Sequence, residues 1–267
     1  MIRQPAVAGQ FYDADPARLK AEILCYVGPS PSNEPAVAVV APHAGYLYSG
    51  AVAGAAYARA AVPETVVVLG PNHTGLGAPA AVMDRGTWTT PLGRVAVAGD
   101  LADLLLAATD LLQRDTTAHV YEHSLEVQVP FLQVRQPALE IVPICLSHLP
   151  YPACREIGEA VAAAVRRLGR PVLLVASTDM THYEPRHQAE AKDRLAIERV
   201  LALDPRGLFE TVASRGITMC GVIPTTVTLV AALALGATEA ELARYATSGD
   251  VTGDDRQVVG YAGFVIR

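Results

Sequence analysis

The chain has 267 residues, of which 51% are hydrophobic and 18% are charged, and its formal net charge is −6. This composition excludes an intrinsically disordered chain, which needs low hydrophobicity and high charge. It also excludes a general nucleic-acid binder, which needs a basic face. A chain of this length can bury a large core without disulfide bonds, and the length alone is compatible with one domain or two.

The N-terminal residues 1–20 contain no apolar core of a signal peptide, and the four cysteines show no CxxC spacing. We therefore expect a cytoplasmic protein with reduced thiols. One charge-free stretch, residues 216–238, is long enough to span a bilayer. The stretch contains Pro224, glycines and threonines, and it has no basic flanking residues. These features favour a loop followed by a buried helix, so we expect no interaction with a membrane.

Short apolar runs alternate with helical patterns along the chain. Four valine- or leucine-rich runs predict strands covered on both faces, as in a parallel sheet, at 36–41, 65–69, 141–146 and 172–176. Helices are expected at 16–26, 49–60, 101–112, 123–133, 152–168, 186–203, 205–214 and from 224 onward. A hairpin is expected at 86–98 and a last strand at 256–266. The alternation predicts a single α/β domain over 1–267, with a mostly parallel central sheet flanked by helices.

Three of these predicted strands end in polar clusters that contain a histidine: His43, His73 and His182. Ligands in open α/β sheets bind beyond the carboxyl ends of strands, so we predict a shared site, with His43 and His73 on adjacent strands. Imidazole suits iron, zinc and copper. Two residues remain open as the third metal ligand: Asp179 would give a two-His-one-carboxylate face, and Cys220 a His2Cys site.

Two further clusters carry titratable groups. Asp179 stands three residues before His182, so it can fix an imidazole tautomer while His182 moves protons; the alternative is a capped loop with a surface histidine. His123 and Glu126 would share one face of the predicted helix 123–133. This spacing occurs in di-iron bundles, but those need a second such helix. We therefore expect His123 and Glu126 to support the ligands or to begin the helix.

Several ordered motifs together resemble the Memo family, whose prokaryotic members are called AmmeMemoRadiSam system protein B. They span almost the whole chain: AVAGQFY at 6–12, PHAGYLYSG at 42–50, GPNH at 70–73, TPLG at 90–93, EHSLEVQVPFL at 122–132, STDMTHY at 177–183, MCG at 219–221 and GYAGF at 260–264. The resemblance implies a fold similar to the LigB-like class III extradiol dioxygenases.

The resemblance also implies a set of site residues. His43 and His73 match the two metal-binding histidines, and Cys220 matches the Memo cysteine where the dioxygenases usually place a carboxylate. His182, with Asp179 beside it, matches the acid/base histidine, and Tyr48 matches a pocket tyrosine. The cysteine in place of a carboxylate sets the chain apart from ordinary extradiol enzymes.

From this resemblance we expect a metal-binding, dioxygenase-like oxidoreductase with non-haem Fe(II), and with copper or zinc as alternatives, acting on a small chelating substrate. One alternative is a non-catalytic module that binds peptides or proteins and keeps a vestigial pocket. Another is a zinc-dependent hydrolase with His2Cys ligands. The family's name in prokaryotes further implies a radical SAM protein and an AMMECR-like protein as partners.

Overall fold

The computed structural model describes residues 1–267, and its strands form one sheet. The centre of the sheet consists of parallel strands in the order β6–β8–β3–β9–β2. Their bounds are β6 Gly93–Val97, β8 Glu140–Leu146, β3 Thr65–Pro71, β9 Val172–Ser177 and β2 Ala38–Ala41. The last four coincide with the four predicted apolar runs, which confirms a largely parallel sheet buried on both faces.

Antiparallel strands extend this centre at both sides. β12 (Val258–Ile266) lies beside β2 and also pairs with β10 (His182–Glu184) and β11 (Ala240–Thr247). On the other side, β5 (Thr87–Thr90) forms the predicted hairpin with β6, and β1 (Ile2–Arg3) pairs with β5. β4 (Ala80–Val82) pairs with β8 and with β7 (Gln113–Arg114). The fold is α/β with a mostly parallel centre, consistent with a LigB-like architecture.

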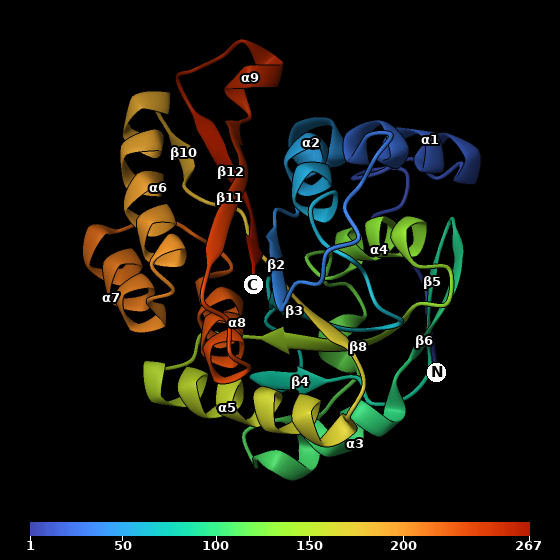
Figure 1. The fold of residues 1–267 in the computed structure, drawn as a ribbon. Coiled ribbons are helices and arrows are strands. Elements are labelled where there is room, and N and C mark those ends of the chain that lie inside the picture. The colour runs from blue at the N-terminus through green and yellow to red at the C-terminus, as the bar shows by residue number, and fades with distance from the viewer.

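Successive residues of the four inner strands β8, β3, β9 and β2 point into two different cores. In β3, Val66 and Val68 enter one core, whereas Val67 and Leu69 enter the other. The first core is covered by α1 (Pro16–Val27), α2 (Tyr46–Tyr57) and α4 (Val129–Arg135). The second is covered by α3 (Gly99–Ala108), α5 (Tyr151–Leu168), α6 (Arg186–Leu201), α7 (Pro205–Arg215) and α8 (Val222–Ala234). Figure 1 shows α1, α2 and α4 together on one side, away from α5 and α8.

The two Asp-Pro pairs that predict helix starts, at 15–16 and 204–205, do begin helices in the structure. The Asp15 carboxylate accepts the backbone N–H groups of Ala17 and Arg18 at the start of α1, and Asp204 accepts that of Gly207 at the start of α7. The charge-free stretch contains the buried helix α8, with Pro224 in its first turn. None of the helices combines the length and the apolar character that crossing a bilayer requires.

Besides the short strands β1, β4, β7 and β10, which the sequence does not predict, three larger details differ from the sequence-based expectations. β9 lies between β3 and β2, so the strands that lead to His43 and His73 are not adjacent. The predicted helix 123–133 is instead a 3-10 turn, η2 (Glu126–Gln128), followed by the short helix α4, which leaves His123 outside any helix. Finally, β11 was not predicted; it forms a long hairpin with β12 through the short helix α9 (Gly249–Thr252), at the top of Figure 1.

Candidate metal centre

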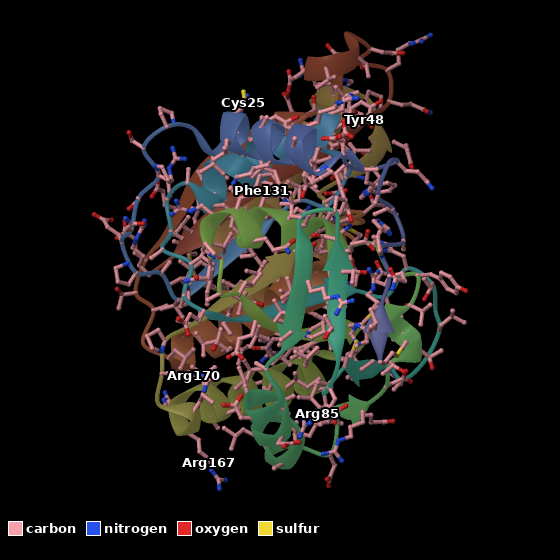
Figure 2. All side chains as sticks on the ribbon, turned by 90° about the vertical axis from the view of Figure 1, so that its right-hand side faces the viewer. Cys25, Tyr48, Arg85, Phe131, Arg167 and Arg170 are labelled. Carbon is pink, nitrogen blue, oxygen red and sulfur yellow. The ribbon has the colours of Figure 1, made fainter.

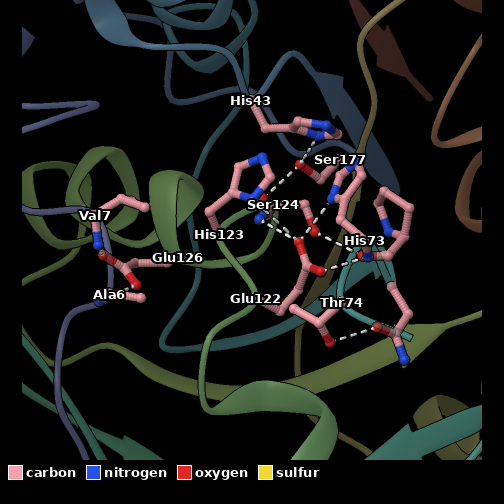
Figure 3. Close-up of polar contacts among 12 residues, drawn as sticks. Ala6, Val7, His43, His73, Thr74, Glu122, His123, Ser124, Glu126 and Ser177 are labelled. Carbon is pink, nitrogen blue, oxygen red and sulfur yellow. Dashed lines mark hydrogen bonds and ion pairs between the residues drawn. The ribbon is translucent and has the colours of Figure 1, made fainter. Parts of the chain in front are cut away.

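Three imidazoles from distant parts of the chain meet beyond the carboxyl ends of the central strands. His43 follows β2, His73 follows β3, and His123 lies on the irregular segment before η2. One ring nitrogen of each lies within 4.8 Å of those of the other two. The rings of His73 and His123 are stacked with centroids 4.6 Å apart, and His43 stands edge-on to both. Figure 3 shows the three rings gathered above the Glu122 carboxylate.

The Glu122 carboxylate orients His73. Its Oε2 accepts the backbone N–H of His73 at 2.6 Å, and its Oε1 lies 2.9 Å from His73 Nδ1 and accepts the Ser124 N–H at 2.9 Å. Burial opposes ionisation of Glu122, but the bonds from His73 and Ser124 outweigh it and lower the pKa of this carboxyl to about 2. An ionised carboxylate only accepts hydrogen bonds, so Nδ1 of His73 is the donor, and in the neutral ring the lone pair lies on Nε2.

A chain of neutral groups orients His43 in the same way. Ser177 Oγ donates to the carbonyl of Ser124 at 2.6 Å, which uses its single hydrogen. It also accepts from Gln128 Nε2 at 2.8 Å and lies 2.9 Å from His43 Nδ1. His43 Nδ1 must therefore be the donor to Ser177, and Nε2 is left with a lone pair. Metal-binding histidines are typically prepared by such a bond on the other ring nitrogen.

His123 completes the cluster without a comparable hydrogen bond. Its Nδ1 lies 3.6 Å from Glu122 Oε1, and the ring of Phe11 packs on it with centroids 4.9 Å apart. Burial lowers the pKa of His123 and, more strongly, that of His43, which the neighbouring imidazoles lower further. Both rings are thus held in the neutral form that binds metals. We expected His123 only to support the ligands; the structure places it among the candidate ligands themselves.

Cys220 lies at the edge of this cluster. Its Sγ is 3.2 Å from His43 Nε2, and the backbone N–H of Asp179 donates to it at 3.3 Å. The following residue must be glycine, because a β-carbon at Gly221 would overlap the carbonyl oxygen of Ser177. Burial, and then the nearby Asp179, raise the pKa of the Cys220 thiol. Without a metal to replace its proton, the sulfur is a neutral thiol against His43.

Asp179 holds the loop after β2 in place. Its Oδ1 accepts the backbone N–H groups of His43 at 2.7 Å and Ala44 at 3.3 Å. Burial raises the pKa of this carboxyl although these bonds favour its ionised form. His182 is oriented separately: its Nδ1 lies 2.9 Å from the carbonyl oxygen of Thr218, which can only accept, so Nε2 keeps the lone pair. The predicted contact between Asp179 and His182 is not among the hydrogen bonds of either side chain.

The cluster opens into a cleft of 480 Å³. It is lined by Phe11, His43, Ala44, Gly45, His73, His123, Asp179, His182, Tyr183, Thr218, Cys220, Val259 and Tyr261. Tyr48 is not among these residues: it lies in the first turn of α2, 38% exposed, and is labelled in Figure 2. The cleft thus unites five of the six residues that we predicted to be metal ligands or catalytic groups, and adds His123.

Glu126 lies behind the site and does not touch the histidines. It is fully buried and accepts hydrogen bonds from the Arg3 guanidinium at 2.5 Å and from the Tyr12 hydroxyl at 2.6 Å. It also accepts the backbone N–H groups of Ala6 and Val7, and Figure 3 shows these two bonds. Arg3 in turn donates to the carbonyl of Glu122 at 2.7 Å. Glu126 therefore ties the N-terminal segment to the segment that carries Glu122 and His123.

The family model described as Memo-like protein matches residues 3–265 of the chain. The chain belongs to the Memo-like family. Two curated members of the family are similar over almost their whole lengths. A MEMO1 family protein of Methanopyrus kandleri is 50% identical over 283 residues, covering 100% of this chain and 99% of the relative. One of Methanothermobacter thermautotrophicus is 45% identical over 274 residues, covering 98% and 99%. The family assigned from the sequence motifs is confirmed.

Proposed function

We propose that this Memo-like protein binds one first-row transition metal, in particular Fe(II), and acts as a dioxygenase-like redox protein on a small chelating substrate. The observation that carries this proposal is the cluster of His43, His73 and His123, with two of the imidazoles fixed in the tautomer that leaves Nε2 free. Neutral nitrogen ligands suit iron, copper and zinc. Cys220, in contact with His43, adds a sulfur that is available as a further ligand.

The donor set fits such a metal on chemical grounds. His73 and His43 are each held by a bond on Nδ1, so little conformational freedom is lost when Nε2 binds an ion. The open cleft leaves room beside the cluster for a ligand that brings its own oxygen donors. A bound Fe(II) would supply the redox chemistry that no protein side chain here provides.

The residues of this chain would bind the substrate and handle its proton. His182 lines the cleft with a free Nε2 and is held by Thr218, so it is placed to accept a proton from a hydroxyl group of an incoming ligand. Asp179 would keep the loop that carries His43 in place while the ligand binds.

The proposal is tested by anaerobic titration of the metal-free protein with Fe(II), followed by measurement of oxygen uptake with a catechol probe. We expect one tightly bound ion per chain, and strong loss of affinity in the His43→Ala and His73→Ala variants. The surface variant His187→Ala on α6 is the matched control. Comparison of His123→Ala with Cys220→Ser decides which of the two supplies the third ligand. Unchanged affinity in both the His43 and the His73 variant would refute the site.

Zinc-dependent hydrolysis is the second candidate, because three histidines with an open position are also the ligand set of some catalytic zinc enzymes. The same protein distinguishes the two functions. Oxygen uptake that requires iron and is absent with zinc supports the redox function. Hydrolysis of an activated ester by the zinc form, lost in His73→Ala and without any oxygen uptake by the iron form, supports the hydrolase.

A further inference from the structure

Tyr183 has an unusual backbone conformation. Its φ is +59°, and Leu203 is the only other non-glycine residue with a positive φ. The left-handed region disfavours bulky side chains and is normally occupied by glycine. Tyr183 is also the extra residue of a β-bulge, since His182 pairs with Val259 and Glu184 pairs with the preceding residue, Val258. Bulges of this kind re-aim side chains and are frequent beside active sites.

The burial of the ring does not compensate for this strain. The Tyr183 side chain is 72% exposed, and its one aromatic neighbour is His182, with ring centroids 5.8 Å apart. Tyr183 is nevertheless one of the residues that line the cleft of the candidate metal centre. A strained residue that adds little to the core is consistent with a role in binding, because a purely structural role would favour glycine at this position.

The other lining residues indicate what Tyr183 would contact. Phe11, which is half-buried, is the other six-membered aromatic ring open to the cleft, Tyr261 lies beneath its surface with only 2% exposed, and no lysine or arginine lines the cleft. Its one carboxyl group, on Asp179, is buried and already accepts two backbone N–H groups. A carboxylate or phosphate on the outer part of a ligand would therefore find no cationic partner, whereas a flat apolar ring would find aromatic faces.

We propose that Tyr183 is a specificity-determining residue on which a planar, uncharged aromatic ligand stacks within this cleft. The proposal deepens the proposed function, on which it rests for the place of the ligand, by naming the class of substrate. The stacking itself needs only the ring of Tyr183 and the cleft, so it can be tested separately from metal binding.

The ligand class is tested with three probes that share two neighbouring oxygens. These are 4-methylcatechol, its anionic counterpart 3,4-dihydroxybenzoate, and the non-aromatic cis-1,2-cyclohexanediol. Binding is measured by calorimetry on the zinc-loaded protein, in which no oxidation occurs, and by ligand-observed NMR on the metal-free protein. We expect 4-methylcatechol to bind at least about tenfold more tightly than either of the others to the loaded protein. Equal or tighter binding of 3,4-dihydroxybenzoate would overturn the assignment of an uncharged ligand.

The role of Tyr183 is tested with three variants. Tyr183→Phe keeps the ring and should bind 4-methylcatechol like the wild type. Tyr183→Gly and Tyr183→Ala remove it and should each weaken binding about two- to tenfold, the range of one aromatic pair. Because glycine accepts a positive φ and alanine does not, Tyr183→Gly should melt about 2–4 °C above Tyr183→Ala. This difference confirms the backbone strain independently of any ligand.

The outcomes separate this proposal from the proposed function. Wild-type affinity for 4-methylcatechol in Tyr183→Gly refutes the stacking role, whatever metal is bound. Failure of the wild type to bind zinc or iron refutes the metal centre, and the NMR comparison of wild type with Tyr183→Gly in metal-free protein then still decides whether Tyr183 holds an aromatic ring.

Discussion

The Glu122→Gln substitution gives a direct test of how the site is prepared for a metal. Glu122 accepts three N–H groups, two from His73 and one from Ser124, and a glutamine amide has only one oxygen with which to replace two. The best arrangement keeps the oxygen toward His73 Nδ1 and Ser124, and turns the NH2 group toward the backbone N–H of His73. One charge-assisted bond is then lost and the other two weaken. Changes of this kind beside a metal-binding histidine typically lower metal affinity 10- to 100-fold, or by about 1.4–2.8 kcal/mol.

The assay is competition for Zn²⁺ or Fe(II) against a chromophoric chelator, at a temperature where circular dichroism shows the variant to be folded. Glu140→Gln is the matched control, because Glu140 lies at the opposite end of β8 from the site and pairs with Arg170. We expect the control to bind metal like the wild type. Nitrogen-15 NMR of His73 in the metal-free protein reports the tautomer directly. Wild-type affinity in a folded Glu122→Gln protein would refute the idea that this carboxylate prepares His73.

Three further predictions follow from other contacts. Ser177→Ala should lower metal affinity by about tenfold, because His43 Nδ1 loses its hydrogen-bond acceptor. Ser177→Thr keeps the hydroxyl group and should bind metal like the wild type. Equal affinities of Ser177→Ala and wild type in a chelator competition would contradict this. Arg3→Ala should lower the free energy of unfolding by about 3–5 kcal/mol in urea titrations, since it leaves Glu126 fully buried without its cation; a loss below about 1 kcal/mol would contradict the buried pair. Burial raises the pKa of Asp193, which accepts from the Thr181 N–H and the Tyr245 hydroxyl, so the folded state binds its proton more tightly than the unfolded state. The Asp193 carboxyl therefore stabilises the fold at acidic pH, and this stabilisation is lost as the pH rises from the pKa of the unfolded chain through the higher pKa of the folded state. Asp193→Asn should thus lower the free energy of unfolding less, relative to wild type, at pH 7 than at pH 4. The reverse order in urea titrations would refute the raised pKa of Asp193.

Local signals were sufficient for much of the fold. Continuous runs such as 65–69 identified buried parallel strands, because a strand covered on both faces has no polar side. Asp15 and Asp204 marked helix starts, since their carboxylates accept free N–H groups there. The position of β9 between β3 and β2 was not visible in this way, because strand order depends on contacts between residues far apart in sequence. The mixed pattern of β11 gave no signal either, as most of its residues are only partly buried.

The candidate site, like the fold, could be predicted only in part from the sequence. The rule that ligands bind at strand ends brought His43 and His73 together from the sequence alone. The position of His123 beside the other two imidazoles is not predicted, because the apolar spacing of 123–133 indicates a helix. In the structure, η2 interrupts that helix, and Glu122 is held by His73, which lies about fifty residues earlier in the chain. A long-range hydrogen bond of this kind leaves no periodic signal. One sign is nevertheless available: three consecutive polar residues, Glu122, His123 and Ser124, precede the alternating segment 125–128.

The position of β12 has a consequence for how the protein is made. Phe264 pairs with Val40, so the strand that leads to His43 has its neighbour supplied by a segment synthesised more than two hundred residues later. During translation, β2 therefore stays an unpaired edge on that side until β12 has left the ribosome, and we expect the loop after β2 that carries His43 to become ordered only then. A ribosome-bound chain that stops before β12 should expose this edge, bind chaperones and take up no metal. The candidate metal centre would then be among the last parts of the molecule to form.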